Sequence, residues 1–143
     1  MGIACVALMR PRETLWCPVR NKHIADRPEE RIRLWVIERL RAHGYPLSAM
    51  QVEYKVGNAG RFDLAVFTPS GDIWLLVECK QASPYKDPLQ LAMQARVQLE
   101  RYARALEKRW RVHHLGLAFG QRLYCLDYLT GQWLQEVPPY PSR

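Results

Sequence analysis

The chain has 143 residues and a formal net charge of +7, from 21 Lys and Arg against 14 Asp and Glu. This length fits one domain with a hydrophobic core of its own, and no segment approaches the roughly 20 consecutive apolar residues of a membrane span. Excess positive charge favours an anionic partner, and nucleic acid is the commonest one. The composition thus argues against a transmembrane helix and favours nucleic-acid binding.

The first 25 residues show no regular hydrophobic period. They carry four basic residues between Arg10 and Lys22 against one acid, Glu13, while Leu15 and Trp16 offer apolar surface. We expect residues 1–25 to form an irregular N-terminal arm that either packs on the domain or contacts phosphate.

The cysteines of the chain do not form a metal-binding pattern. None lies in a C-x-x-C motif, and no histidine stands at zinc-finger spacing. We interpret all four as reduced thiols of a cytoplasmic protein: Cys5, Cys17, Cys79 and Cys125.

A helix is expected from about Asp26 to Ala42. Asp26 is a candidate N-cap, with Glu29 three residues later in a capping-box arrangement, and Gly44 stops the helix. These signals place a helix directly before the first strand.

Charged residues accompany the apolar face of this helix. Glu29 and Arg33 project on the same face as Ile32 and Leu40, and Glu30 lies at its edge. Either glutamate could reach a site beneath the helix, although capping and the helix dipole also account for both.

Three strands are expected next, over residues 50–56, 62–67 and 73–77, with turn sequences between them. They form a meander whose central strands are apolar on both faces, which predicts helices on both sides of the sheet. Glu53, in the middle of the first strand, is either an extra acid near a metal or, as we favour, an edge charge that discourages strand pairing.

A two-residue turn centred on residues 70 and 71 would place Asp63 directly opposite Glu78 on one face of the second hairpin. Their Cβ atoms would then lie about 5 Å apart. Lys80 lies two residues beyond Glu78 and shares its face, whereas Cys79 points to the other. A slip of one residue in the register would break this arrangement.

Two like charges that face each other destabilise a sheet, so Asp63 and Glu78 require compensation. A bound Mg²⁺ or Mn²⁺ would provide it, because hard cations take carboxylate, carbonyl and water oxygens. Without a metal, Lys80 and Arg61 could neutralise the pair as a salt-bridge network. The spacing alone leaves both interpretations open.

A long basic helix is expected from about Leu89 to Arg109, after a loop that contains two prolines. Gln94, Gln98 and Tyr102 follow one another at intervals of four residues and form one stripe of it. Such a stripe could hydrogen-bond an active site or a phosphate, or be an ordinary helix surface.

The remaining elements complete an α+β domain over residues 26–137, with a central mixed sheet between helices. A proline-rich tail follows, which cannot join a helix or a sheet. The strands expected in this part, with the last one short, and the tail are residues 113–119, 123–128, 133–137 and 138–143.

Six motifs follow one another in a recognisable order. They are Pro28-Glu29-Glu30-Arg31-Ile32-Arg33, Gly44-Tyr45-Pro46, Glu53, Arg61-Phe62-Asp63, Val77-Glu78-Cys79-Lys80 and Gln98-x-x-x-Tyr102. Their order resembles the PD-(D/E)xK nuclease superfamily and, more narrowly, the N-terminal nuclease domain of type I restriction enzyme R subunits. The resemblance covers roughly residues 15–128, and the ordered set is specific although each motif alone is weak.

The resemblance implies a restriction-endonuclease-like core and a set of roles. Asp63 and Glu78, with the main-chain carbonyl of Cys79, would hold Mg²⁺ or Mn²⁺, and Lys80 would orient or activate the attacking water. The supporting residues would be Glu29 or Glu30, Gln98 and Tyr102, and the nucleic-acid contacts would be Arg33, Arg61 and Arg101.

The resemblance further implies a divalent-metal-dependent endonuclease that hydrolyses phosphodiester bonds, expected in DNA. The chain contains no P-loop motif, so ATP-driven translocation is not carried over. A homodimer, or motor and specificity subunits acting in trans, would be partners alongside DNA. Two alternatives stay open: an inactive nucleic-acid-binding module, and an assembly subunit of a restriction or repair complex.

Overall fold

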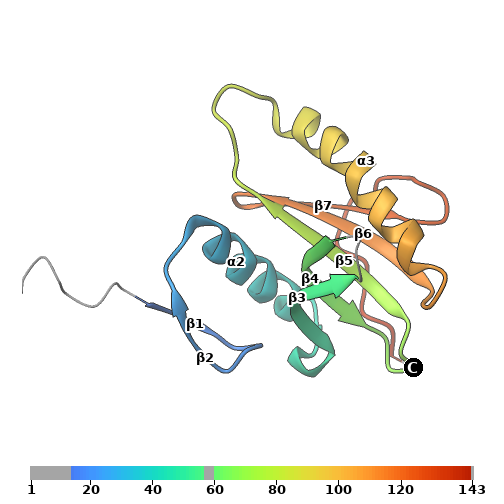
Figure 1. Ribbon diagram of the computed structural model, residues 1–143, viewed down its shortest axis with the longest axis horizontal. Coiled ribbons are helices and arrows are strands. Elements are labelled where there is room, and N and C mark those ends of the chain that lie inside the picture. The colour runs from blue at the N-terminus through green and yellow to red at the C-terminus, as the bar shows by residue number, and fades with distance from the viewer. Residues whose placement is uncertain (1–13, 57–59, 143) are drawn as a thin grey trace, which may run out of the picture.

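A mixed sheet of five strands lies between two helices in the computed structural model of the chain, which describes residues 14–56 and 60–142 (Figure 1). The strands are ordered β3-β4-β5-β6-β7 across the sheet, and a separate two-stranded sheet, β1-β2, precedes them. The elements are β1 (Thr14–Cys17), β2 (Lys22–Ala25), α2 (Pro28–Ala42), η1 (Leu47–Ala49), β3 (Met50–Val56), β4 (Gly60–Phe67), β5 (Ile73–Lys80), α3 (Pro88–Leu106), β6 (Val112–Phe119) and β7 (Arg122–Asp127).

The connections explain the mixture of strand directions. Strands β3, β4 and β5 form the expected antiparallel meander, and β6 pairs with β7 in the same way. Strands β5 and β6 are parallel, because α3 carries the chain back to the end where β5 began. The α+β class and the mixed central sheet are therefore confirmed.

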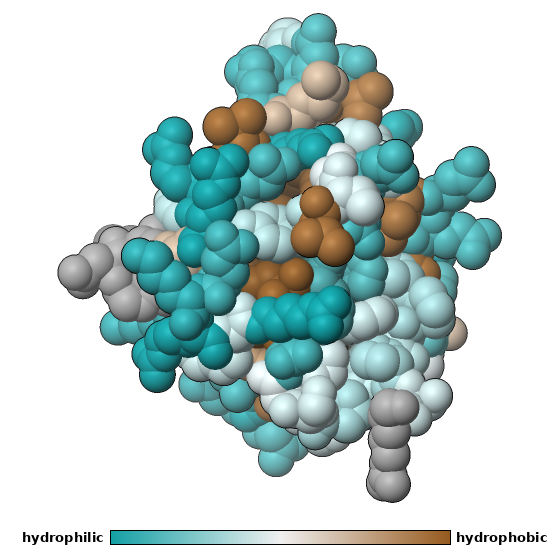
Figure 2. All heavy atoms as spheres, turned by 90° about the vertical axis from the view of Figure 1, so that its right-hand side faces the viewer, coloured by the Kyte–Doolittle hydropathy of each residue, from teal (hydrophilic) through white to brown (hydrophobic). Residues whose placement is uncertain are grey.

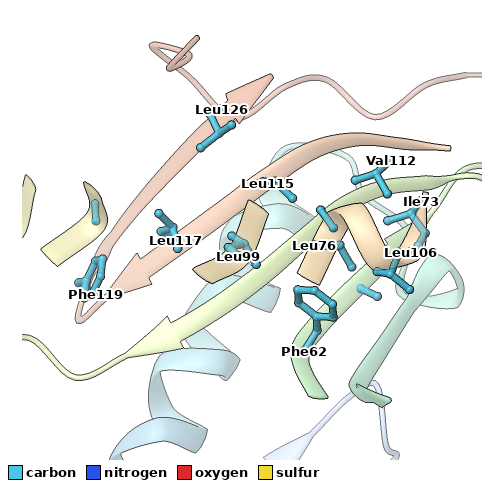
Figure 3. Close-up of a cluster of buried hydrophobic side chains, with 13 residues drawn as sticks. Phe62, Ile73, Leu76, Leu99, Leu106, Val112, Leu115, Leu117, Phe119 and Leu126 are labelled. Atoms are coloured by element: carbon cyan, nitrogen blue, oxygen red, sulfur yellow. The ribbon is translucent and has the colours of Figure 1, made fainter. Parts of the chain in front are cut away.

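Each face of the sheet is covered by one helix, as the two-sided apolar strands predict. Helix α3 packs on one face through Leu99 and Leu106, which meet Phe62, Leu76 and other buried side chains (Figure 3). Helix α2 covers the other face with a second buried cluster that contains Ile32, Val36, Ile37, Leu40, Leu64, Val66, Leu75 and Val77. Complete burial of one such side chain contributes roughly 1.5–3 kcal/mol to folding.

Helix α2 begins one residue later than its capping signal indicates. Arg27 is the N-cap residue, without a side-chain cap, and Pro28 occupies the first turn. The carboxylate of Asp26 instead accepts a hydrogen bond of 2.6 Å from Arg31 Nε. The Asp26 cap was therefore wrong, whereas the end of the helix at Ala42 is as expected.

The turn between β4 and β5 differs from the predicted two-residue turn. Gly71 N–H donates to the Thr68 carbonyl, so the turn is centred on Pro69 and Ser70, which suits the fixed φ of proline at its second position. Phe67 then pairs with Ile73, and a bulge shifts the register so that Val66 pairs with Leu75 and Leu64 with Val77. The bulge restores the predicted register beyond the turn, although the predicted turn was wrong.

The N-terminal segment from residue 14 is not irregular. Strands β1 and β2 form an antiparallel hairpin in which Leu15 pairs with Ile24, and its turn contains Asn21 with φ +55. Asparagine tolerates this left-handed conformation better than most residues. The prediction of an irregular arm was therefore wrong for residues 14–25, and residues 1–13 lie outside the described part of the chain.

The C-terminal segment packs on the domain without forming a strand. Trp133 makes only an isolated bridge to Leu126, so the predicted strand over residues 133–137 is reduced to one pair. The Tyr45 hydroxyl donates to the Pro138 carbonyl, and the Tyr140 hydroxyl donates to the Phe67 carbonyl. The predicted turn over residues 57–60 lies mostly outside the described residues.

Glu53 interrupts the regular alternation of side chains along the meander. Its φ is +53, a left-handed value that is strained for a side chain with a Cβ atom. On either side of it the strand pairs turn to opposite faces: Val52 and Leu64 lie toward α2, whereas Tyr54 and Phe62 lie toward α3. The strained backbone therefore interrupts the alternation of both strands at Glu53 and at the facing Asp63.

Replacing Glu53 by glycine is expected to give a more stable protein than replacing it by alanine, by about 0.5–1 kcal/mol, because only glycine adopts a positive φ without strain. Both variants lose the carboxylate, so their difference isolates the backbone. Urea denaturation measures the free energy of unfolding of each. At Gln51, an exposed position of the same strand without positive φ, the order should reverse; the same order at both positions would contradict the interpretation.

Hydrophilic side chains cover most of the face shown in Figure 2, and apolar side chains form small separate patches there. The large apolar residues that are exposed in the described part of the chain are Trp16, Tyr85, Leu89, Met93, Val97 and Leu129. In the same residues, no helix has the length and apolar character needed to cross a membrane.

Candidate active site

The site lies where β4 separates from β5. Their pairing ends at Leu64 and Val77, and the carboxylate of Asp63 occupies the position that the next pair would take. Its Oδ2 accepts a hydrogen bond of 2.7 Å from the backbone N–H of Cys79. Its Oδ1 accepts one of 2.9 Å from Arg33 Nη2. The interrupted alternation explains how a strand residue reaches a backbone group of the neighbouring strand.

Glu78 lies beside Asp63 and is mostly buried, with 20% of its side chain exposed. Burial raises the pKa of Glu78 to about 8, and the negative charge of Asp63 and a hydrogen bond to it act in the same direction. The ammonium group of Lys80, with its Nζ 3.8 Å from Glu78 Oε1, opposes this rise. The structure thus brings together the three residues predicted for catalysis, although Asp63 and Glu78 are not a strand pair.

The free energy of unfolding of the wild type is expected to fall as the pH rises, and replacing Glu78 by glutamine is expected to abolish this fall. The folded pKa of about 8 lies above the ordinary 4.5, so the folded state retains a proton that the unfolded state releases. This contribution is fully present below the ordinary pKa and is lost as the pH rises through the folded one. In chelator-containing buffer, the stability of the wild type relative to the variant should fall by at least about 1 kcal/mol between about pH 5 and pH 9, measured by urea denaturation.

A control for this pH dependence is Glu38→Gln, on the exposed face of α2, where 64% of the Glu38 side chain is accessible. Its stability should follow that of the wild type at every pH. Parallel curves for Glu78→Gln and the wild type would contradict the raised pKa.

Arg33 is the residue whose place differs most from the prediction. It was expected to contact nucleic acid, but only 4% of it is exposed, and it lies beneath α2 with its two terminal nitrogens on Glu30 and Asp63 at 2.6 and 2.9 Å. Burial lowers its pKa, but the hydrogen bonds and charges of Asp63 and Glu30 outweigh this, and the net shift is upward. Arg33 therefore orients Asp63 and is not available to a phosphate.

The predicted salt-bridge network is present in part. Lys80 lies near Glu78, as that interpretation requires, but Arg61 pairs with Glu53 at 3.7 Å and not with Asp63. The cation on Asp63 is Arg33. Strand β3 is an edge strand, which fits the edge-charge interpretation of Glu53.

Arg20 extends the ion pairs to the β1–β2 hairpin. Its guanidinium contacts Glu30 at 3.2 Å and Glu53 at 3.1 Å. Glu30 in turn holds Arg33. One charged network thus joins the hairpin turn, α2 and β3 to the candidate site.

The two glutamates at the start of α2 have different surroundings. Glu30 is engaged by Arg20 and Arg33. Glu29 is exposed, and its negative charge contributes to the raised pKa of Glu78. Of the two, Glu29 is therefore the acid that remains accessible on the side of Glu78.

The predicted stripe on α3 lies at the start of β4. Gln98 Nε2 donates a hydrogen bond of 2.9 Å to the Tyr102 hydroxyl, and the Tyr102 ring packs edge-on against Phe62, the neighbour of Asp63. Gln98 and Gln94 also line a pocket with Lys80. Arg101, on the same helix, is exposed.

The groups near Asp63 limit how a divalent cation could be held. In the described part of the chain, no group of three His, Cys, Asp or Glu side chains is placed to hold a metal. Asp63 and Glu78 are two carboxylates, and Cys79 directs its N–H toward Asp63. In a strand, the carbonyl of a residue points to the same side as its N–H.

These groups fit a cation that retains several waters. An ionised carboxylate has about four lone-pair positions, so Asp63 can keep both hydrogen bonds and still bind a metal. Mg²⁺ commonly uses only one or two protein carboxylates, with waters completing its shell. The raised pKa leaves Glu78 largely protonated near neutral pH, and a bound cation would favour its ionised form.

Sequence reasoning missed the roles of Arg33 and Arg20. Arg33 lies on the apolar face of its helix, and a charged residue on a buried face needs a buried partner; this signal pointed to an acid beneath the helix. Arg20 lies in the hairpin turn, far from Glu53 in sequence, and no local pattern connects them.

The chain is an α+β domain in which Asp63, Glu78 and Lys80 lie together at one end of the β4–β5 hairpin. The family described as the type I restriction enzyme R protein N terminus (HSDR_N) matches residues 28–138. The chain belongs to this family, which supports a role in a restriction system. No curated protein and no solved structure matches the chain.

Proposed function

We propose that this chain is a divalent-metal-dependent nuclease that hydrolyses phosphodiester bonds in DNA. The observation that carries the proposal is the Asp63 carboxylate, fixed between Arg33 and the Cys79 N–H beside a protonatable Glu78. Two adjacent, mostly buried carboxylates repel each other when both are ionised, which a bound metal ion would offset, and membership of a restriction enzyme family supports DNA as the substrate.

Asp63, Glu78 and the carbonyl of Cys79 would hold Mg²⁺ or Mn²⁺. When bound, the ion supplies polarisation of the phosphoryl oxygen and a lower pKa for a coordinated water. Lys80 Nζ, half-exposed at the edge of the site, places a positive charge where the phosphate becomes more negative during attack. Arg33 and the Cys79 N–H hold Asp63 in one orientation throughout.

Other groups of the site act on the substrate or its surroundings. Glu29 offers an accessible carboxylate near Glu78, and Gln98 with Tyr102 supports the start of β4. Arg61 and Arg101 are exposed and face solvent, as contacts to a phosphate backbone require. Motor or specificity subunits of a restriction system, or a second copy of the chain, are the protein partners of this proposal.

Isothermal titration of Mn²⁺ into wild type and Asp63→Asn, with plasmid nicking on the same samples, tests the proposal. We expect wild type to bind Mn²⁺ and nick, and the variant to lose both. Asp72→Asn is the matched control, because Asp72 lies before the first residue of β5, at the opposite end from Lys80, and should behave as wild type.

Two results would contradict the proposal. Absence of Mn²⁺ binding by the wild type would support the salt-bridge interpretation, in which Arg33 and Lys80 alone neutralise the acids, and the chain would be a nucleic-acid-binding module. Mn²⁺ binding that depends on Asp63 but is accompanied by no nicking would indicate a metal site without nuclease turnover, as in an assembly subunit.

A further inference from the structure

A groove lies where the β1–β2 hairpin meets the start of α2, beside the candidate active site. In Figure 1 the hairpin lies next to α2 on the side away from α3. The groove is lined by Arg20, Lys22, His23, Ile24, Ala25, Arg27, Glu30 and Glu53. It is therefore built largely from the segment expected to be an irregular arm, for which the sequence left open either packing on the domain or contact with phosphate.

The two acids of this groove are already paired with arginines. Glu30 contacts Arg20 at 3.2 Å and Arg33 at 2.6 Å, and Glu53 contacts Arg20 at 3.1 Å and Arg61 at 3.7 Å. The negative charges of Glu30 and Glu53 are thus neutralised by arginines of the protein itself. The groove keeps an excess of positive charge at its rim, where a phosphate would enter.

The rim consists of exposed basic side chains. Lys22, His23 and Arg27 are exposed, and within the described residues Lys22 and Arg27 take part in no ion pair that would compete with a ligand. Arg27 is also the N-cap residue of α2, and its side chain makes no capping hydrogen bond to the helix.

An aromatic surface continues the rim along the hairpin. Trp16 is 49% exposed and packs edge-on against His23 with ring centroids 5.1 Å apart. Basic side chains next to exposed aromatic rings are typical of surfaces that bind nucleic-acid strands.

We propose that this groove binds the phosphate backbone of the nucleic acid on one side of the bond to be cut. This inference rests on the proposed function, because a nuclease needs a surface that holds its substrate. It adds which surface that is. Arg20 is the link between the two, because it anchors the hairpin turn to Glu30, which holds Arg33 and through it Asp63. Phosphates seated in the groove would therefore lie in a fixed relation to the candidate site.

The test is the salt dependence of DNA binding by Lys22→Ala/Arg27→Ala, measured by fluorescence anisotropy with a labelled DNA duplex in metal-free buffer. Each lost phosphate contact lowers the slope of log affinity against log salt concentration by about 0.9, so the double variant should bind at least about tenfold more weakly at low salt and with a slope smaller by about 2. Lys108→Ala/Arg111→Ala removes the same charge at the opposite end of the sheet, next to the start of β6, and should retain the wild-type slope.

The proposal is overturned if Lys22→Ala/Arg27→Ala keeps the affinity and slope of the wild type, if the control pair loses as much, or if the wild type does not bind the duplex. Plasmid nicking by the wild type in Mg²⁺ is followed separately. A reduced slope with no nicking would leave the groove supported and the nuclease proposal contradicted, so the two failures can be told apart.

Discussion

Arg33→Met is expected to lower the free energy of unfolding by about 3–5 kcal/mol, the usual cost of breaking a buried ion pair by removing one partner. Arg33 is 4% exposed, and both Asp63 and Glu30 have 15% side-chain exposure. Without the guanidinium, these carboxylates would remain buried with one fewer cation. Urea denaturation near neutral pH measures the loss.

Arg41→Met is the matched control on the same helix. Arg41 is 45% exposed and pairs with Glu38 on the solvent side, and such surface pairs contribute at most about 1 kcal/mol. The double variant Arg33→Met/Asp63→Asn should recover part of the loss, because the acid is removed with its partner. A loss for Arg33→Met no larger than that of Arg41→Met would show that Arg33 does not stabilise the site.

Lys80→Met is expected to lower the rate of DNA cleavage about 10²–10³-fold, the range seen when a group that stabilises transition-state charge is removed. Lys80 is 45% exposed, so its replacement should leave the fold intact. Single-turnover cleavage at saturating DNA and Mn²⁺ separates the chemical step from binding. The affinity for Mn²⁺ should change far less than it does in Asp63→Asn.

The matched control for Lys80 is Lys86→Met, which removes the same charge from an exposed position in the loop that follows β5. It should cleave at the wild-type rate. Equal rates for Lys80→Met, Lys86→Met and wild type would exclude Lys80 from catalysis, whereas equal reductions would indicate a general effect of positive charge on substrate binding.

Regular patterns allowed the central fold to be predicted from sequence. The apolar runs at Phe62–Phe67 and Ile73–Val77 predicted a two-sided sheet, and the structure has α2 and α3 on its two faces. The register around Leu64 and Val77 was also as expected. The predicted turn was wrong because its length could not be inferred without the bulge, in which β5 has one residue more than β4.

The charged network could not be predicted from local patterns. Only the tertiary fold brings its members together, because they come from the β1–β2 turn, α2, β3 and β4: Arg20, Glu30, Arg33, Glu53 and Asp63. The left-handed φ of Glu53 was also hidden, because a glutamate carries no signal for a positive φ. The grouping of Asp63, Glu78 and Lys80 was accessible because a hairpin relates residues that are close in sequence.

The bulge that follows the β4–β5 turn has a practical consequence for labelling the protein. Pro69 and Ser70 are exposed, and they lie at the end of the hairpin opposite to Lys80. Exposed loop tips are where added segments are best accepted. The bulge, at which the register changes between the pairs Phe67–Ile73 and Val66–Leu75, separates this tip from the regular pairs that lead to Asp63 and Glu78. A short affinity tag or a fluorophore attachment sequence inserted between Pro69 and Ser70 should therefore leave the end of the hairpin with the candidate site as it is.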